Sequence, residues 1–139
     1  MTVRPFAQAL QRLRSAGLRP TQQRLALARL LFDKGNRHLT AEQIHEEALA
    51  ASVPVSLATV YNTLNQFIAA GLLREVVVDP GRSYFDTNLS DHHHFFLEDA
   101  GKLVDIPNDR IAVASLPSAP PGMTIRRVDV IIRVGRSSA

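Results

Sequence analysis

Residues 56–85 read SLATVYNTLNQFIAAGLLREVVVDPGRSYF, and this stretch changes from a helical to a strand pattern. Ser56 is a typical N-cap residue, and apolar residues recur at helical spacing from Leu57 to Phe67. A β-branched segment, an Asp79-Pro80-Gly81 turn and a second short apolar segment follow. This order predicts a helix followed by a two-stranded hairpin, which is the end of a winged-helix domain.

Three further helices are predicted before this stretch. Apolar spacing indicates a helix from Phe6 to Ala16, and a second helix opens at Pro20-Thr21 and runs to about Lys34. Thr40-Ala41-Glu42-Gln43 is a capping box that starts a third helix, ending near Ala51. A compact bundle joined to a hairpin predicts an N-terminal winged-helix DNA-binding domain over residues 1–87.

The polar face of the last helix favours contact with DNA. It carries hydrogen-bonding side chains and no acid: Thr59, Tyr61, Asn62, Asn65 and Gln66. Such groups suit base edges and phosphates, although an ordinary solvated face is the alternative. Residues 1–37 also hold eight bases and one acid, which indicates a polyanionic partner unless these arginines merely cover solvated helices.

The second half predicts a small α/β domain over residues 88–139, which gives the chain an α+β fold. Strands are expected at 95–97 and 103–106, a short helix at 111–116, and a longer strand at 123–134. A module of this size buries little apolar surface alone, so pairing with a second copy is expected.

Composition excludes several classes of protein. The chain has 139 residues, 45% of them hydrophobic, and no cysteine, so disulfides, thiolate catalysis and Cys-type zinc sites are excluded. Neither a membrane-spanning run nor a secretory leader pattern is evident, so the cytoplasm is the expected compartment and no membrane partner is expected. No His-Glu-x-x-His helix or phosphate loop occurs, so an enzyme is not expected.

Three consecutive histidines, His92-His93-His94, concentrate possible ligands at one point of a chain that has five histidines in all. In an extended strand, His92 and His94 share one face and His93 points to the other. Imidazole binds both metal ions and haem iron, and the residue types do not choose among Zn²⁺, Mn²⁺ and Fe²⁺. The segment predicts a sensing site attached to a DNA reader.

The chain resembles the ferric uptake regulator (Fur) family over nearly its whole length. The segments that carry the resemblance are Gly17–Arg24, His38–Glu42, Ala58–Leu64, Gly71–Leu73, Tyr84–Asp86, the histidine triplet and Gly101–Val104. The resemblance implies a homodimeric transcription regulator that binds double-stranded promoter DNA, with a tetramer on DNA as a further option. In such a regulator the winged helix binds DNA and the second domain dimerises and senses the signal.

The resemblance also implies site residues. The regulatory metal ligands correspond to His38, Asp86, His92 and His94. Asp91 and His93 correspond to a remnant of a second site, whose later ligands are replaced by Ala112 and Val128. The candidate DNA-binding residues are Arg19, Thr21, Gln22, Arg24, Ser56, Thr59, Tyr61, Asn62 and Asn65.

Two departures from the family pattern refine these expectations. Leu97 and Ala100 stand where relatives commonly have a Cys-x-x-Cys zinc pair, so that structural zinc is not expected. Asn62 replaces a common arginine and suits adenine instead.

The histidine triplet followed by aromatics is similar to the iron response regulator (Irr) branch. That similarity implies a haem site at His92, His93 and His94, control of iron homeostasis and haem synthesis genes, and DNA binding when iron is scarce with release by haem. The alternatives are a repressor activated by Fe²⁺, Mn²⁺ or Zn²⁺, and a metal or haem carrier that does not bind DNA.

Overall fold

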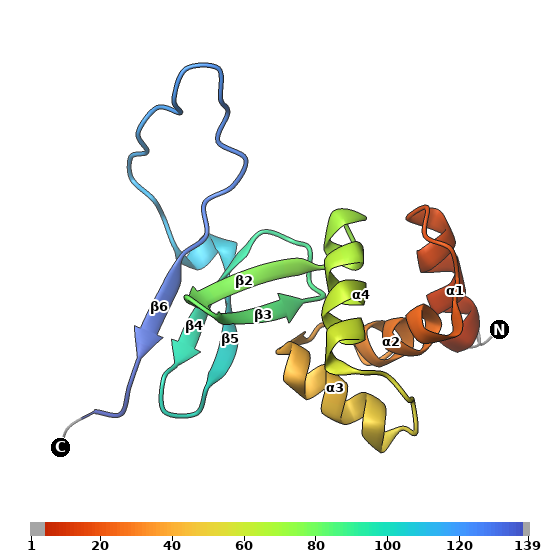
Figure 1. Ribbon diagram of the computed structural model, residues 1–139. Coiled ribbons are helices and arrows are strands. Elements are labelled where there is room, and N and C mark those ends of the chain that lie inside the picture. Colours follow the sequence, from red (N-terminus) through yellow and green to blue (C-terminus); the bar gives the residue numbers. More distant parts are fainter. Residues whose placement is uncertain (1–4, 138–139) are drawn as a thin grey trace. The chain divides into compact units, whose positions relative to one another are not determined.

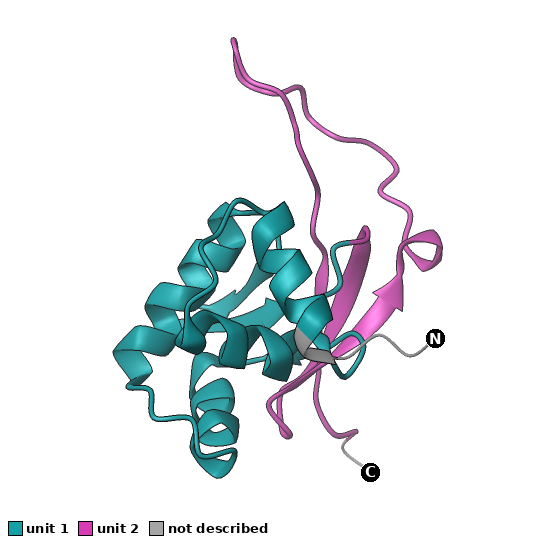
Figure 2. Ribbon diagram, turned by 90° about the vertical axis from the view of Figure 1, so that its right-hand side faces the viewer, with its two compact units in different colours: residues 1–89 teal, residues 90–139 magenta. Residues whose placement is uncertain are grey.

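The computed structural model describes residues 5–137 and divides the chain into two compact units, residues 1–89 and 90–139 (Figure 2). The first unit contains four helices and a three-stranded sheet, and the second is built on another three-stranded sheet. The expected α+β class is therefore confirmed. Within the described range, no helix is both long enough and apolar enough to cross a bilayer.

The first unit follows the expected order of helices and hairpin (Figure 1). Its elements are α1 (Pro5–Ser15), α2 (Gln22–Phe32), β1 (His38–Leu39), α3 (Ala41–Ala50), α4 (Leu57–Ala69), β2 (Arg74–Asp79) and β3 (Arg82–Asp86). Among the elements described in this unit, only the two-residue strand β1 has no counterpart among the predicted ones.

Hydroxyl side chains fix where three of these helices begin. Thr21, Thr40 and Ser56 accept hydrogen bonds from the backbone N–H groups of Arg24, Gln43 and Thr59. Such bonds satisfy backbone donors that have no partner inside the helix. Thr40 and Gln43 form a complete capping box, as the sequence predicted.

Helix α4 lies at the centre of the apolar core of the first unit. Val60, Leu64 and Phe67 are completely buried, and the Phe67 ring lies 6.1 Å from the ring of Phe32 in α2. The remaining core comes mainly from α2 and α3. Because one face of α4 is buried so completely, its orientation within this unit is fixed and its polar face is held toward solvent.

Strands β1, β3 and β2 form an antiparallel sheet in that order. The Asp79–Arg82 turn closes the β2–β3 hairpin, with Gly81 at a φ of 80° that glycine adopts without steric cost. On the other side of β3, His38 of β1 lies directly opposite Asp86. This short pairing brings together two residues that are far apart in the sequence.

The second unit consists of β4 (His92–Leu97), β5 (Lys102–Pro107), the 3₁₀ turn η1 (Asn108–Arg110) and β6 (Ile131–Val134). Strand β4 is central, antiparallel to β5 and parallel to β6.

Two hydrogen bonds tie the end of β6 to the β4–β5 turn. Glu98 N–H donates to Val134 O and Arg136 N–H donates to Asp99 Oδ2, both at 2.9 Å. Leu97 and Ala100, the positions where the sequence analysis expected a Cys-x-x-Cys pair to be missing, lie at this junction beside Val134.

Two predicted elements of this unit are wrong. Residues 111–116 form no helix, and the third strand begins at Ile131 rather than at Met123. The long loop between η1 and β6 contains Pro117, Pro120 and Pro121 (Figure 1), which supply no N–H donor for regular structure. The alternating pattern starts before Ile131, but a strand forms only from Ile131 onward, where residues 94–97 of β4 provide a partner.

Candidate functional site

The three histidines of β4 divide between the two faces of the strand. His92 and His94 share one face, with their ring centroids 4.6 Å apart. His93 lies on the other face, and all three rings are at most 5% exposed. The triplet therefore provides one pair of neighbouring imidazoles and one separate imidazole.

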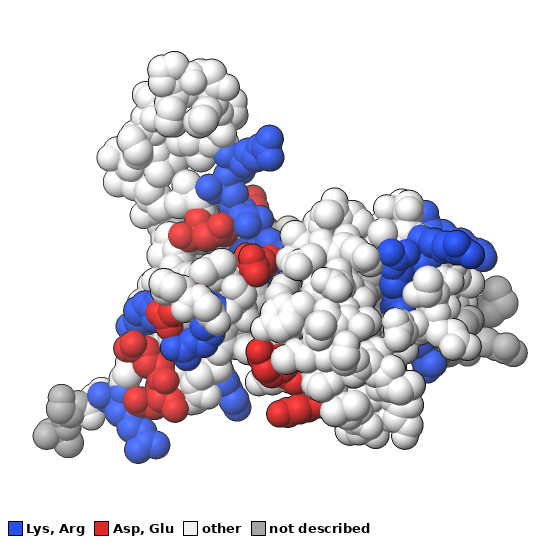
Figure 3. All heavy atoms as spheres, viewed as in Figure 1, with Lys and Arg blue, Asp and Glu red and all other residues white. Residues whose placement is uncertain are grey.

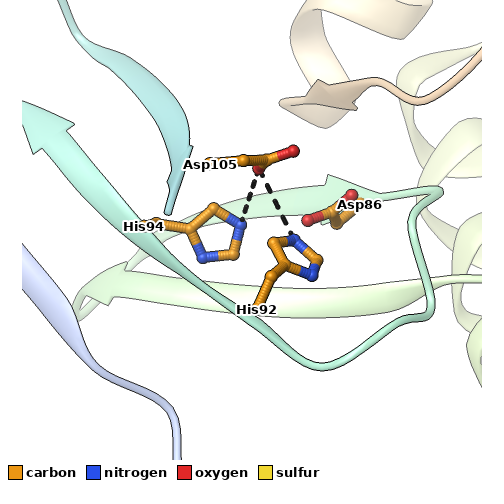
Figure 4. A group of neighbouring side chains, drawn as sticks. All are labelled: Asp86, His92, His94 and Asp105. Atoms are coloured by element: carbon orange, nitrogen blue, oxygen red, sulfur yellow. Dashed lines mark ion pairs between the residues drawn. The ribbon is translucent and has the colours of Figure 1, made fainter. Parts of the chain in front are cut away.

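Asp105 of β5 completes the cluster on the face of His92 and His94. Its Oδ1 atom lies 3.5 Å from His92 Nε2 and 3.4 Å from His94 Nε2. Figure 4 shows both rings turned toward this carboxylate. His94 and Asp105 are directly opposite each other in the β4–β5 ladder, so their side chains emerge on the same face.

The hydrogen bonding of His92 shows why this cluster suits a cation. His92 Nδ1 lies 2.6 Å from the carbonyl oxygen of Ser90, which can only accept, so Nδ1 carries the proton. In the neutral ring, Nε2 then directs a lone pair toward the Asp105 carboxylate. A metal ion bound between these atoms would accept the Nε2 lone pair and bond to the carboxylate as well.

The separations between the donor atoms also fit a small metal ion. Two atoms held about 2.0–2.1 Å from one tetrahedral ion lie about 3.3 Å apart. The 3.4 and 3.5 Å separations around Asp105 are close to this spacing. With nitrogen and oxygen donors only, His92, His94 and Asp105 suit Zn²⁺, Mn²⁺ or Fe²⁺.

Asp105 was missed by the sequence analysis. The hairpin itself contained the signal, because extending the ladder back from the turn at residues 99–101 places residue 105 opposite residue 94. The family resemblance pointed instead to Asp86 as the carboxylate of the regulatory ligand set.

The other two sequence-predicted ligands, His38 and Asp86, belong to the first unit. They face each other across the β1–β3 ladder, and Asp86 is 1% exposed. The Asp86 carboxylate, also drawn in Figure 4, accepts a hydrogen bond of 2.9 Å from Asn88 N–H. The first unit thus supplies a His–carboxylate pair of its own.

Arg37 anchors strand β1 beside His38. Its backbone exchanges hydrogen bonds of 2.8 and 2.9 Å with Thr87, and its guanidinium lies 2.6 Å from the Glu47 carboxylate of α3. The hydrogen bond from Arg37 lowers the pKa of Glu47 below its ordinary value. This arrangement fixes the residues next to His38 and Asp86 to helix α3.

On the opposite face of β4, His93 is engaged in a different way. His93 Nδ1 accepts a hydrogen bond of 3.0 Å from Val130 N–H, so the proton of the neutral ring is on Nε2. His93 and Asp91 line a cavity of about 260 Å³, and Val128 lies in its wall with a side chain that has no metal-binding atom. While the Val130 bond is made, neutral His93 has no nitrogen lone pair for a metal or haem iron.

The candidate DNA-binding residues of α4 present an exposed polar row. Tyr61, Asn62 and Asn65 are exposed, whereas Thr59 is half-buried and Ser56 caps the helix. Helix α4 itself carries no acid, as expected, but Tyr61 Oη donates a hydrogen bond of 2.8 Å to Glu42 of α3, so a carboxylate from another helix borders this face. The sequence of α4 alone could not show a carboxylate that arrives from another helix.

The candidate residues around α2 lie beside those of α4. Arg24 donates from Nε to Gln66 Oε1 at 3.0 Å and from Nη1 to Arg19 O at 2.8 Å. Thr21 caps α2, and Gln22 is exposed at its first turn. Lys and Arg side chains gather over α1 and α2 in Figure 3. These positions form a polar and basic surface within the first unit.

This combination of elements occurs in known proteins that are similar to this chain. The profile of the ferric uptake regulator family matches residues 15–132. The chain is 35% identical over 100 residues to the ferric uptake regulation protein of Shigella flexneri, covering 71% of this chain and 68% of that protein. It is 38% identical over 99 residues to the peroxide-responsive repressor PerR of Staphylococcus aureus, covering 70% and 66%.

Solved structures of ferric uptake regulators have a similar fold. The ferric uptake regulator of Pseudomonas aeruginosa with manganese superimposes with a TM-score of 0.70 at 25% identity, covering 94% of this chain and 98% of that one. The Vibrio cholerae ferric uptake regulator gives a TM-score of 0.72 at 25% identity, covering 91% and 98%. With its winged-helix unit and its histidine-bearing second unit, the chain belongs to the ferric uptake regulator family of metal-responsive transcriptional regulators.

Proposed function

We propose that this protein is a metal-responsive regulator that binds double-stranded promoter DNA, and hence acts in the cytoplasm. The observation that carries the proposal is the convergence of His92 Nε2 and His94 Nε2 on Asp105 Oδ1. In this proposal residues 1–87 bind DNA, and residues 88–139 dimerise and sense the signal. The two relatives that support it are named as a regulation protein and a repressor.

The proposed ligand set is His38, Asp86, His92 and His94, to which the geometry of the second unit adds Asp105. The ion takes ligands from both halves of the chain, so its binding favours one arrangement of the DNA-binding half relative to the dimerisation half. In a dimer, that arrangement sets the spacing of the two α4 helices. Fe²⁺, Mn²⁺ and Zn²⁺ are the candidate ions, and the P. aeruginosa relative was solved with manganese.

The proposed dimer uses the exposed apolar row of the second sheet. Phe95, Val104 and Ile132 are neighbours across β4, β5 and β6, and they are 37%, 44% and 39% exposed. An exposed apolar row on a small unit favours association with a second copy. Two dimers on one operator would give a tetramer, which the mass of the DNA complex distinguishes from a dimer.

The identity of the signal separates two versions of the proposal. A metal-activated repressor binds DNA when loaded with the ion. An Irr-like regulator of iron homeostasis and haem synthesis genes binds when iron is scarce and is released by haem at His92, His93 or His94. Val130 N–H already donates a hydrogen bond to His93 Nδ1, which counts against haem binding at this histidine. This bond therefore favours the metal-activated version.

Fluorescence anisotropy of labelled promoter duplexes tests the proposal. The apo protein and samples with Mn²⁺, Fe²⁺, Zn²⁺ or haem are titrated separately, each at several salt concentrations. A metal-activated repressor gains affinity with the ion, and log Kd changes linearly with log salt because phosphate contacts release counterions. Loss of binding on haem addition supports the Irr-like version. Metal or haem binding without any DNA binding would leave the carrier alternative.

A further inference from the structure

The contact between Tyr61 and Glu42 bears on how the DNA-facing helix discriminates bases. Tyr61 is 39% exposed on the polar face of α4, and Glu42 is an exposed residue of the first turn of α3. Their side-chain oxygens are 2.8 Å apart. The hydrogen bond to Glu42 raises the pKa of Tyr61 above its ordinary value, which agrees with a proton held between the two groups.

The direction of this hydrogen bond determines what Tyr61 offers to a ligand. An ionised carboxylate has no proton to donate, so the phenol proton of Tyr61 points to Glu42. A phenol has only one proton. The oxygen is therefore left with acceptor lone pairs, and the exposed part of the ring offers an apolar surface.

In the major groove, these properties select particular partners. An acceptor oxygen suits the amino groups of adenine N6 or cytosine N4, and an apolar ring suits the methyl group of thymine. The same oxygen cannot donate to a phosphate or to guanine O6. The negative charge of Glu42 also repels phosphate oxygens that approach Tyr61.

We propose that Glu42 is a positioning residue that makes Tyr61 a specificity-determining group, by occupying the only proton of the phenol. Tyr61 then pairs with a base amino group or a thymine methyl and does not anchor the DNA backbone. This inference rests on the proposed DNA-binding function and adds a role for an acidic residue outside the recognition helix.

Four variants separate this role from a structural one. Glu42→Ala frees the phenol proton, Glu42→Gln keeps a carbonyl acceptor of the same shape, and Tyr61→Phe removes the hydroxyl. Glu46→Ala is the matched control, because it removes an exposed acid from the same helix α3. Glu42 and Tyr61 line a cavity of about 250 Å³ together with residues of the hairpin, so smaller side chains fit there.

The first experiment measures the affinity of each metal-loaded variant for an operator duplex and for duplexes with one base pair changed. Glu42→Ala should lower discrimination at one base position by roughly fivefold to tenfold, the scale of a single lost base contact, and strengthen binding to non-operator DNA. Glu42→Gln should restore most of the discrimination, and Glu46→Ala should leave it unchanged. Equal discrimination in wild type and Glu42→Ala would overturn the inference.

A second experiment needs no DNA and so distinguishes this inference from the proposed function. Ultraviolet titration of the tyrosines in a Tyr84→Phe background should show the pKa of Tyr61 falling toward its ordinary value in Glu42→Ala but not in Glu46→Ala. An unchanged Tyr61 titration would overturn the inference even if DNA binding is intact. If the Tyr61 pKa falls in Glu42→Ala as expected but the protein binds no duplex, the regulator function is refuted instead.

Discussion

At the scale of single residues, one ring nitrogen separates two kinds of histidine on β4. His92 donates Nδ1–H to Ser90 O, which leaves Nε2 to face Asp105, whereas His93 accepts from Val130 N–H. The first arrangement prepares a metal ligand, and the second joins β4 to the chain that leads into β6. Neighbouring residues of the same type are therefore expected to respond differently to substitution.

Replacing His92 and His94 together by alanine should abolish the metal response. Metal affinity should fall by more than about 100-fold, because even the loss of a group that only supports a ligand costs roughly 10- to 100-fold. Isothermal titration calorimetry with Mn²⁺ or Zn²⁺ measures this loss. His93→Ala is the control, with metal affinity retained and the free energy of unfolding lowered by about 1–3 kcal/mol. A loss of metal binding in His93→Ala equal to that of the double variant would contradict the division of roles.

The ion pair between Arg37 and Glu47 should make the stability of the first unit depend on pH. The pKa of Glu47 is lowered from 4.5 by the hydrogen bond from Arg37, so the stabilisation is complete above pH 4.5 and is lost as the pH falls through the folded-state pKa. Glu47→Gln should reduce the free energy of unfolding by about 1–2 kcal/mol at pH 7.

Urea denaturation at pH 7 and at several values below pH 4.5 measures this difference. The difference in the free energy of unfolding between wild type and Glu47→Gln should decrease as the pH falls. The control variant Glu46→Gln, at an exposed position, should change the free energy of unfolding little at any pH. A difference between wild type and Glu47→Gln that stays constant with pH would contradict the assignment.

At the scale of helices and strands, local chemistry explains why some elements start where they do. Thr40 accepts from Gln43 N–H and Gln43 Oε1 accepts from Thr40 N–H, at 3.1 and 2.9 Å. Both bonds lie within four residues, so the start of α3 was predictable from the sequence. The same holds for Ser56 and α4.

Thr40→Ala should therefore lower the free energy of unfolding of the first unit by about 1 kcal/mol. Thr40→Ser retains a hydroxyl that can accept from Gln43 N–H and should recover most of this loss. Chemical denaturation monitored by circular dichroism measures the free energy of unfolding of both variants. Equal stability of Thr40→Ala and wild type would show that the capping box contributes nothing to the folded unit.

Elements that depend on distant partners were harder to predict. Strand β1 has only two residues, and its partner Asp86 lies 48 positions after His38. Residues 111–116 have the apolar spacing of a helix but no regular structure, since the pattern cannot indicate whether a surface exists to pack against.

The same limit applies to the candidate site. The sequence identified His92 and His94, because alternation along a strand is a local rule. Asp105 required the register of the hairpin, and the approach of Glu42 to Tyr61 required the packing of α3 against α4. What the sequence analysis missed or mispredicted thus depended mainly on contacts between elements.

At the scale of the whole molecule, the apolar row on the second sheet is the surface that we expect a second copy to cover. Phe95 lies between Val104 and Ile132 in the ladder, so the row crosses all three strands. A surface of this kind on a regulator with one α4 helix per chain allows two such helices to bind one duplex.

Val104→Glu should weaken dimerisation by roughly 100-fold or more, because burying an unpaired charge costs about 3–5 kcal/mol. Analytical ultracentrifugation over a range of protein concentrations measures the change. Val77→Glu is the control, since Val77 is 56% exposed on β2 of the first unit. If Val104→Glu left the dimer unchanged, another surface would form the interface.

The junction between β6 and the β4–β5 turn has a consequence for the conditions that the protein tolerates. It is made by the Glu98–Val134 and Arg136–Asp99 hydrogen bonds beside Leu97 and Ala100, in a chain without cysteine. A zinc–thiolate clamp opens when a chelator removes its metal or when peroxide oxidises its sulfurs. This junction contains no thiolate, so peroxide has no sulfur to oxidise there, and a chelator that removes the sensor's ion should silence the sensor without dismantling the unit that carries it.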